Sequence, residues 1–253
     1  MADTMTEAQK IGPEAGVTPN SAATPPKLGL LARLGGVIFS PRQTFASIVA
    51  YPKWFGAMAV AVLITAVGQF ALLSTDVGKQ LALDQQVAAM EAFGQTVSDE
   101  AYANLEQGME RARYISPVLT IFATPLFTAM IAGLMHLVFG LIGGGNGTFR
   151  QVYAVNAHTG IFGGLLIVFT TLVTVAAGRP AGADLSVFVP TLEESTFIYR
   201  FLSTINFFYV WSLFVTAIGL GVLYKRRTGP IAMVLFGIYL VIALIIGFVR
   251  SGS

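Results

Sequence analysis

Residues 229–249, GPIAMVLFGIYLVIALIIGFV, form an apolar stretch without a charged side chain. A helix of about 20 such residues is long enough to cross the roughly 30 Å hydrocarbon core of a bilayer. The whole chain agrees, because 55% of its 253 residues are hydrophobic and 11% are charged, whereas soluble domains carry about 25% charged residues. Too few charges remain to cover a water-facing surface, so we predict an all-α, polytopic membrane helix bundle.

Four more uncharged stretches precede this one, which gives five predicted transmembrane helices. Their predicted bounds are 55–73, 115–142, 152–177, 201–224 and 229–249. The second is the longest, and Pro125 is expected to kink it. At about 1.5 Å per residue it exceeds the bilayer core only moderately, so tilt accommodates it as one helix.

The segments before the first span have a different character. Residues 1–27, rich in Ala, Thr, Pro and Gly, are typical of a disordered tail and lack the apolar core of a secretory signal. Residues 28–39 are predicted to form an amphipathic helix that lies on the inner membrane face. Ser40 and Pro41 are the residue types that cap and open a helix, so a second short helix is expected there. Residues 28–253 are assigned to a single membrane domain.

The longest loop, 75–114, is not predicted to be structureless. Residues 79–93 carry apolar side chains at helical spacing, and Gly94 ends the pattern. Residues 98–113 open with Ser-Asp-Glu, which suits the positive end of a helix. We therefore predict an external helical hairpin.

The basic residues decide the predicted orientation, since cytoplasmic loops carry an excess of Lys and Arg. With five spans, the side that holds the amino terminus has nine basic residues and the other side has six. Lys225, Arg226 and Arg227 lie on the first side, in a short loop, where basic residues carry most weight. The chain is predicted to lie in the cytoplasmic (inner) membrane, with its amino terminus in the cytoplasm and its carboxyl end outside.

Polar side chains inside the predicted spans are the candidate binding residues, because a polar group in lipid is costly unless it is paired. They are His136, Asn156, His158 and Asn206. His136 and His158 lie on spans joined by a short loop, so the two imidazoles are expected to share a level with Asn156. A functional interpretation is a ligand or proton site, and a structural one is hydrogen bonding between helices. Two histidines without a cysteine or nearby carboxylate fall short of a metal site.

Residues that would carry other chemistry are few. The chain has no cysteine, which excludes disulfides and thiol catalysis, and its formal charge of +2 is too mild to suggest nucleic-acid binding. The glycine-rich loop 143–147 lacks the Lys-Ser/Thr that a phosphate-binding loop needs, so a tight turn is the better interpretation. Lys225, Arg226 and Arg227 are candidate contacts for anionic lipid headgroups. We predict no enzyme activity, no cofactor and no metal.

Three short motifs give the chain a family resemblance. They are IFSPRQTF at 38–45, GGGNGTFRQ at 143–151 and NFFYVWS at 206–212. On these, the chain resembles the Yip1-domain membrane proteins, and more closely their prokaryotic branch. The resemblance implies five helices, a cytoplasmic amino terminus and a short external carboxyl end. Eukaryotic relatives bind small Rab-type GTPases and typically carry an Asp-Leu-Tyr-Gly-Pro motif, whose absence here argues against small-GTPase binding.

Two hypotheses for function follow. The first is a non-enzymatic membrane organising protein that binds membrane lipids and other membrane proteins through its inner-face helices and external hairpin. The alternative is a transporter, channel or lipid-moving protein with a polar crevice around His136 and His158, to which Asn156 and Asn206 contribute. No acidic residue lies inside a predicted span, which argues against ion-driven transport.

Overall fold

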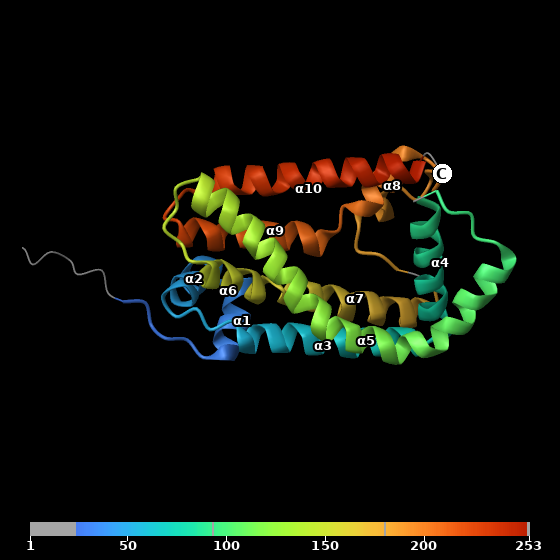
Figure 1. The fold of residues 1–253 in the computed structure, drawn as a ribbon, viewed down its shortest axis with the longest axis horizontal. Coiled ribbons are helices and arrows are strands. Elements are labelled where there is room, and N and C mark those ends of the chain that lie inside the picture. The colour runs from blue at the N-terminus through green and yellow to red at the C-terminus, as the bar shows by residue number, and fades with distance from the viewer. Residues whose placement is uncertain (1–23, 93, 180, 252–253) are drawn as a thin grey trace, which may run out of the picture.

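The computed structural model describes residues 24–92, 94–179 and 181–251 as a bundle of helices (Figure 1). The α-helices are α1 (Leu30–Phe39), α2 (Pro41–Ala50), α3 (Phe55–Leu73), α4 (Asp76–Ala92), α5 (Asp99–Met135), α6 (Phe149–Thr159), α7 (Ile161–Ala177), α8 (Phe197–Thr204), α9 (Phe207–Leu223) and α10 (Thr228–Ser251). A π-helix, η1 (His136–Ile142), continues α5, and a 3-10 helix, η2 (Leu185–Phe188), precedes α8. Within the described ranges, the β pairing is limited to an isolated bridge between Asp184 and Asn206. The predicted all-α fold is confirmed.

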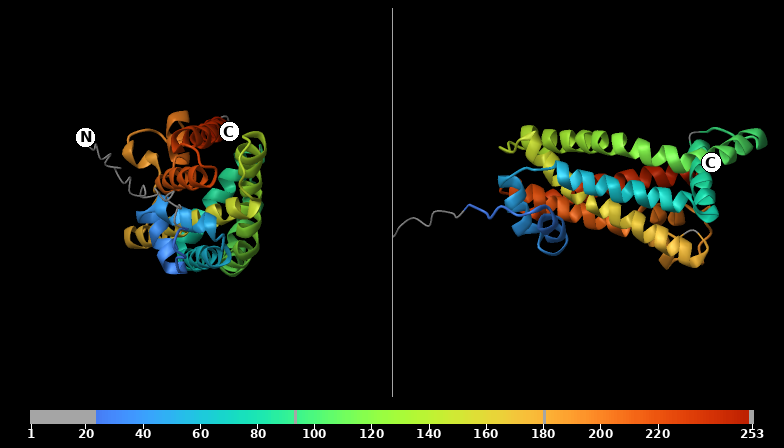
Figure 2. Two further views of the ribbon diagram at one scale, coloured as in Figure 1. Left: turned by 90° about the vertical axis from the view of Figure 1, so that its left-hand side faces the viewer. Right: turned by 90° about the horizontal axis from the view of Figure 1, so that it is seen from below.

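The bundle is elongated, and its long helices run between its two ends (Figures 1 and 2). One end holds residues 24–54 with α1 and α2, the segment 143–150 and the loop 225–227; we name it the basic end. The other holds α4, residues 178–179 and 181–196 with η2, and α8; we name it the acidic end. The chain passes between these ends along α3, α5, α6 with α7, α9 and α10 in turn (Figure 1). This alternation agrees with the predicted order of loops, while the side that faces the cytoplasm stays a prediction.

Four helical segments of the described chain are long and apolar enough to cross a membrane. They are Phe55–Leu73, Asp99–Ile142, Phe149–Ala177 and Thr228–Val249. The apolar helix α9 has 17 residues, and at 1.5 Å per residue it is about 26 Å long. The structure is thus that of a helical membrane bundle, and the count of five spans stays a prediction that depends on α9.

The second predicted span has a different beginning in the structure. Helix α5 starts at Asp99 and continues through η1 to Ile142, so the second arm of the predicted hairpin and the second predicted span are one helix. The two helices of the predicted hairpin are therefore present as α4 and the start of α5, but the expected break between 113 and 115 is wrong. Residues 113–116 contain neither Gly nor Pro, and a change from charged to apolar side chains does not by itself interrupt backbone hydrogen bonds.

The third and fourth predicted spans are each divided. The third breaks at Gly160 into α6 and α7, next to Thr159, whose hydroxyl donates to the Asn156 carbonyl at 3.1 Å. The fourth begins with the separate helix α8, and α9 starts only after Asn206. The Asn206 side chain caps α9 by accepting a hydrogen bond from the Phe208 amide at 2.9 Å. Its role as an N-cap explains the division, because Asn at this position favours a new helix start.

The two short helices expected before the first span are confirmed as α1 and α2. Ser40 and Pro41 occupy the N-cap and first positions of α2 as predicted. The Ser40 side chain makes no capping bond; instead the Thr44 hydroxyl donates to the Ser40 carbonyl at 2.9 Å. Helix α2 ends at Ala50.

Helix α6 lies at the centre of the basic end, where it packs against α1, α2, α3, α5 and α9. Two hydrophobic clusters meet on it, one with α9 and α10 and the other with α1, α2 and α7. Close packing here depends on a small residue in α9. A Cβ added to Gly219 would lie 2.6 Å from Val155 Cγ1 and 3.1 Å from the Phe45 ring. The basic end is therefore the tightly packed part of the fold.

Candidate functional site

A large polar cleft runs from the acidic end into the bundle as far as α6. Its volume is about 1450 Å³, larger than the roughly 300–1,000 Å³ of common ligand pockets. Hydroxyl and amide side chains from α3, α5, α6, α7 and α9 line it within the apolar helices: Thr65, Gln69, Thr124, Thr128, Asn156, Thr159, Thr170 and Ser212. Charged side chains line the part nearest the acidic end: Arg179, Asp184, Glu193 and Glu194. The cleft offers a polar surface among helices that are otherwise apolar.

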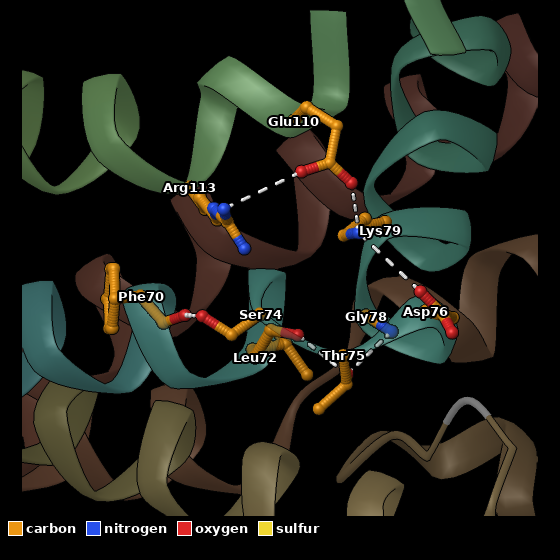
Figure 3. A network of polar contacts seen from close by, with 9 residues as sticks. All are labelled: Phe70, Leu72, Ser74, Thr75, Asp76, Gly78, Lys79, Glu110 and Arg113. Atoms are coloured by element: carbon orange, nitrogen blue, oxygen red, sulfur yellow. Dashed lines mark hydrogen bonds and ion pairs between the residues drawn. The ribbon is translucent and has the colours of Figure 1, made fainter. Parts of the chain in front are cut away.

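Helix α4 forms part of the wall of this cleft at the acidic end, through residues that include Gly78, Leu81 and Gln85. Figure 3 shows the polar contacts that hold α4 against α5. Lys79 pairs with Glu110, and Arg113 Nη2 lies 3.8 Å from the same carboxylate.

The hydrogen bond from Lys79 lowers the pKa of the Glu110 carboxyl, and the bond to Glu110 raises the pKa of Lys79. The turn before α4 is closed by the Thr75 hydroxyl, which donates to the Leu72 carbonyl at 2.7 Å and accepts from the Gly78 amide at 3.0 Å (Figure 3). These contacts fix α4 across this end of the cleft.

Two of the four predicted binding residues line the cleft, namely Asn156 and Asn206. Asn156 Nδ2 donates to the Val152 carbonyl at 3.0 Å and lies 3.4 Å from Met135 Sδ on α5. The backbone amide of Asn206 donates to Tyr239 Oη at 3.1 Å, which ties the start of α9 to α10. Both asparagines thus have structural partners and also border the cleft.

The two predicted histidines are not among the residues that line the cleft. His158 is fully buried; its Nδ1 donates to the Ala154 carbonyl at 2.7 Å, and its Nε2 has no hydrogen-bond partner in the described part of the chain. On a helix, positions two apart differ by about 200° in direction, so His158 and Asn156 cannot face one cavity. The crevice expected around the histidines is therefore replaced by a cleft on the Asn156 side of α6.

His136 lies elsewhere, as the first residue of the π-helix η1. A Cβ added to Gly140 would lie 2.9 Å from His136 Nδ1 and 3.2 Å from Tyr224 Oη. Both of these polar atoms are buried without a hydrogen-bond partner in the described residues. His136 therefore borders Tyr224 at the basic end, and the structure does not bring it together with His158 in a common site.

The glycine-rich loop 143–147 packs against the ring of Tyr224. A Cβ on Gly145 would lie 2.3 Å from Tyr224 Cδ1, and one on Gly147 would lie 2.8 Å from Cε1. Arg226 donates to the Gly143 carbonyl and closes the contact between the two loops of the basic end. This supports the interpretation of the loop as a tight turn, since the glycines make room for an aromatic ring.

A capping box that sequence inspection missed follows this loop. Thr148 accepts from the Gln151 amide, and the Gln151 side chain accepts from the Thr148 amide at 2.9 Å. Gln151 Nε2 also donates to the Val49 carbonyl at 3.0 Å, which links α6 to α2. The Thr-x-x-Gln spacing before a helix was the available signal.

The predicted lipid-headgroup residues line a cavity of about 520 Å³ at the basic end. Lys225, Arg226 and Arg227 form one side of it, and Arg42 from α2 adds a fourth basic side chain that sequence spacing does not reveal. All four side chains are exposed. The cavity therefore presents a concentrated positive charge at the end of the bundle.

A comparison with known protein families identifies the family of the chain. The Yip1 domain model matches residues 35–250. The chain belongs to the Yip1 family. No curated protein and no solved structure matches it. The predicted Yip1 resemblance is confirmed, and with the apolar helices it establishes a multi-pass membrane protein of this family.

The first two Yip1 motifs quoted above meet at the core of the basic end, and the third lies toward the acidic end. Phe45 of the first motif is fully buried beside Val155 and Gly219. The second motif forms the loop against Tyr224 and the start of α6. The third motif starts α9 with the Asn206 cap. In this Yip1 protein the motif residues serve mainly to set helix starts and close packing.

Charge is strongly segregated in this Yip1 protein. Residues 24–54, 143–150 and 225–227 hold eight basic residues and no acidic one: Lys27, Arg33, Arg42, Lys53, Arg150, Lys225, Arg226 and Arg227. Each Asp and Glu in the described residues lies in α4, in the part of α5 before Arg111, or in 178–196. No group of three or more His, Asp or Glu side chains that could hold a metal ion occurs in these described parts. The segregation of charge is suited to electrostatic contact with charged partners.

Proposed function

We propose that this Yip1 protein is a non-enzymatic membrane organising protein, whose basic end gathers anionic lipids and whose external α4–α5 hairpin contacts other membrane proteins. The observation that carries the proposal is the basic end, with eight basic residues and no acidic one in the ranges given above. A Lys or Arg near an anionic membrane surface contributes about 1 kcal/mol of attraction. Several such residues on one rigid end concentrate anionic lipid beside the protein.

The proposal includes an orientation, with the basic end in the cytoplasm and the carboxyl end outside an inner membrane. The excess of Lys and Arg at one end supports it. The chain has no cysteine, so a single introduced cysteine is a clean reporter. A cysteine at Asn146, in a basic-end loop, should be protected from an impermeant thiol reagent in intact cells. A cysteine at Gln95, in the loop before α5, should be labelled, and the reverse pattern would overturn the orientation.

Lipid gathering is tested in vesicles that contain a self-quenching fluorescent phosphatidylglycerol. The wild-type protein should increase quenching, and the double variant Arg42→Gln, Arg227→Gln should reduce that increase by about a quarter or more, because two of the eight basic residues that attract the lipid are lost. The double variant Arg111→Gln, Arg179→Gln removes two charges near the acidic end and serves as the matched control. Equal quenching for all three proteins would count against the proposal.

Partner binding is tested separately by crosslinking in native membranes. Photoreactive groups placed on the exposed face of α4 should capture a recurrent membrane protein, and groups placed on the buried face of α6 should not. A consistent lack of any captured protein from α4 positions would remove the protein-interaction part of the proposal and leave the lipid part standing.

The polar cleft favours a second candidate function, a pathway for a lipid headgroup or a polar solute. Its test uses reconstituted vesicles with Asn156→Leu, which makes a cleft-lining position apolar, and His158→Leu, which changes a buried position outside the cleft. A pathway through the cleft predicts faster crossing of labelled lipid than in empty vesicles, slowed several-fold by Asn156→Leu and little changed by His158→Leu. If nothing crosses faster than in empty vesicles, this candidate is excluded.

A further inference from the structure

A second basic cavity lies between the beginning of α1 and the end of α2. Its volume is about 340 Å³, and its polar lining consists of Lys27, Arg33, Ser47, Tyr51 and Lys53. It shares no lining residue with the cavity at Arg42 and Lys225. The size is in the range of small-ligand pockets, about 300–1,000 Å³.

Arg33 is the unusual member of this cavity, because it is a basic side chain that is only 7% exposed. Its Nη1 donates to the Lys53 carbonyl at 2.9 Å, and its buried Nε has no hydrogen-bond partner in the described residues. Burial lowers the pKa of the Arg33 guanidinium. A buried charge is normally paired with an opposite charge, yet residues 24–75 contain no Asp or Glu.

The other polar groups of the cavity add positive charge and a hydroxyl. Lys27 and Lys53 are exposed at its edge, and Lys27 Nζ lies 6.0 Å from the centre of the Tyr51 ring. Ser47 Oγ accepts from the Leu28 amide at 3.3 Å and keeps its own proton for a ligand. Three cations and a hydroxyl around one space match the chemistry of a phosphate group, which accepts several hydrogen bonds and carries negative charge.

The position of the cavity points to the source of such a phosphate. On α1, the large apolar side chains of Leu31 and Phe39 are 82% and 85% exposed, and Phe55 at the start of α3 is 73% exposed. An exposed apolar face on a short helix at the end of a membrane bundle is expected to enter the boundary between headgroups and acyl chains. The cavity then lies at the level of the lipid phosphates.

We propose that this cavity binds the phosphate of an anionic phospholipid headgroup, with Arg33 as the buried ligand and Lys27 and Lys53 at the entrance. The inference rests on the proposed function in one respect, since both place the basic end among headgroups. It assigns a discrete site to one lipid, whereas the proposed function concerns attraction by the whole end.

The experiment uses the full-length protein in an uncharged detergent and measures its thermal unfolding midpoint during titration with dihexanoyl phosphatidylglycerol. Dihexanoyl phosphatidylcholine and inorganic phosphate are titrated in parallel. A ligand that binds the folded protein raises the midpoint in a concentration-dependent way. Arg33→Gln should raise the apparent Kd for phosphatidylglycerol about tenfold or more, the size expected for a lost hydrogen bond between charged groups.

Two further variants make the result decisive. Lys27→Gln with Lys53→Gln changes only exposed side chains, so it tests the site even if Arg33→Gln folds poorly; it should weaken binding about fivefold or more. Arg150→Gln removes one exposed charge from the same end outside the cavity and should leave the Kd within about twofold.

Each outcome has a separate meaning. Loss of phosphatidylglycerol binding in both cavity variants, with Arg150→Gln unaffected, supports the site. Equally tight binding of inorganic phosphate with the same variant pattern would assign the cavity to free phosphate and overturn the lipid source. Equal weakening by Arg150→Gln, or no binding by any anion, would overturn the site. The quenching assay on the Arg42 and Arg227 variant leaves this cavity intact, so failure of the proposed function is recognised independently.

Discussion

Helices α6 and α7 come from one uncharged stretch of sequence, yet they have different surroundings. Seven of the eleven residues of α6 are buried, whereas four of the seventeen residues of α7 are buried. The division lies at Gly160, which separates the largely buried α6 from α7, most of whose residues are not buried. One apolar sequence thus supplies both a rigid anchor and the wall of a polar cavity. Hydropathy alone does not distinguish these two roles.

The polar residues of the two helices show the same contrast. In α6, Thr159 is 4% exposed and accepts a bond from Thr216 of α9, although it also borders the cleft, and His158 is fully enclosed. In α7, Thr170 lines the cleft and Thr171 donates to the Gly68 carbonyl of α3 at 3.3 Å. We infer that stability is concentrated around α6 and that the half around α7 is the part able to adapt to a ligand.

The largest expected difference between the halves concerns aromatic side chains. Phe45 is fully buried against α6 and α9, and Phe127 borders the cleft with 60% exposure. Phe45→Ala should lower the free energy of unfolding by about 3–5 kcal/mol, because it leaves a cavity in the packed half. Phe127→Ala should lower it by less than about 1 kcal/mol. Unfolding of the purified protein in detergent measures both, and equal losses would refute the contrast.

Glycine substitutions should show a difference in stability of intermediate size between the two halves of the bundle. A Cβ on Gly219 would lie 2.6 Å from Val155 Cγ1, whereas one on Gly163 would have no neighbouring atom within 4 Å. Gly219→Ala should destabilise the protein by about 1–3 kcal/mol through overpacking. Gly163→Ala should be neutral or stabilising by up to about 1 kcal/mol, since Ala favours a helix more than Gly does. The same unfolding assay applies, and a loss with Gly163→Ala similar to that with Gly219→Ala would contradict the prediction.

The sequence predicts most directly those features that depend on unbroken apolar length. The first span, 55–73, coincides with α3, because charged or turn-forming residues flank an uninterrupted apolar run. The division of the third span was harder to predict. Gly160 and Thr159 are small residues that also occur inside membrane helices, and the break depends on how α6 fits its neighbours.

The candidate site could be predicted only in part for similar reasons. Depth along a helix suggested that His158 and Asn156 lie together, but depth omits direction around the helix. A separation of two residues, about 200°, already excludes a shared face. Arg33 and Arg42 could not be grouped with their partners from sequence, since those partners come from other segments and meet only through packing. Asn206 was recognisable as a cap before an apolar run, although its place inside an apolar stretch favoured the binding interpretation.

Hydrogen bonds between helices should show a smaller version of the same contrast. Thr216, 3% exposed, donates to Thr159 Oγ1 at 3.2 Å, and Thr171 donates to the Gly68 carbonyl from a partly exposed position. Interhelical hydrogen bonds in membrane proteins contribute about 0.6 kcal/mol on average and up to about 1.7 kcal/mol. Thr216→Val should lower the free energy of unfolding by an amount in this range, and Thr171→Val should lower it by less. A larger effect from Thr171→Val would show that the half around α7 is the more rigid one.

The smallest expected effect is on the contact that holds α4 across the cleft. Glu110 has a lowered pKa, so its contribution is present above the ordinary value of 4.5 and is lost as the pH falls through the lowered value. Lys79 has a raised pKa, so its contribution is present below 10.5 and is lost as the pH rises through the raised value. The pair thus supports α4 between these limits, and only weakly, because exposed ion pairs are screened by solvent.

Hydrogen exchange of the α4 amides should be accelerated by Glu110→Gln at pH 7 and by acidification of the wild type, after correction for the intrinsic pH dependence of exchange. Exchange in α6 should be unchanged in both cases. Glu106→Gln, a substitution on the same arm, is the matched control, and acceleration by this variant equal to that by Glu110→Gln would show that general charge, rather than the Lys79 contact, holds α4 in place.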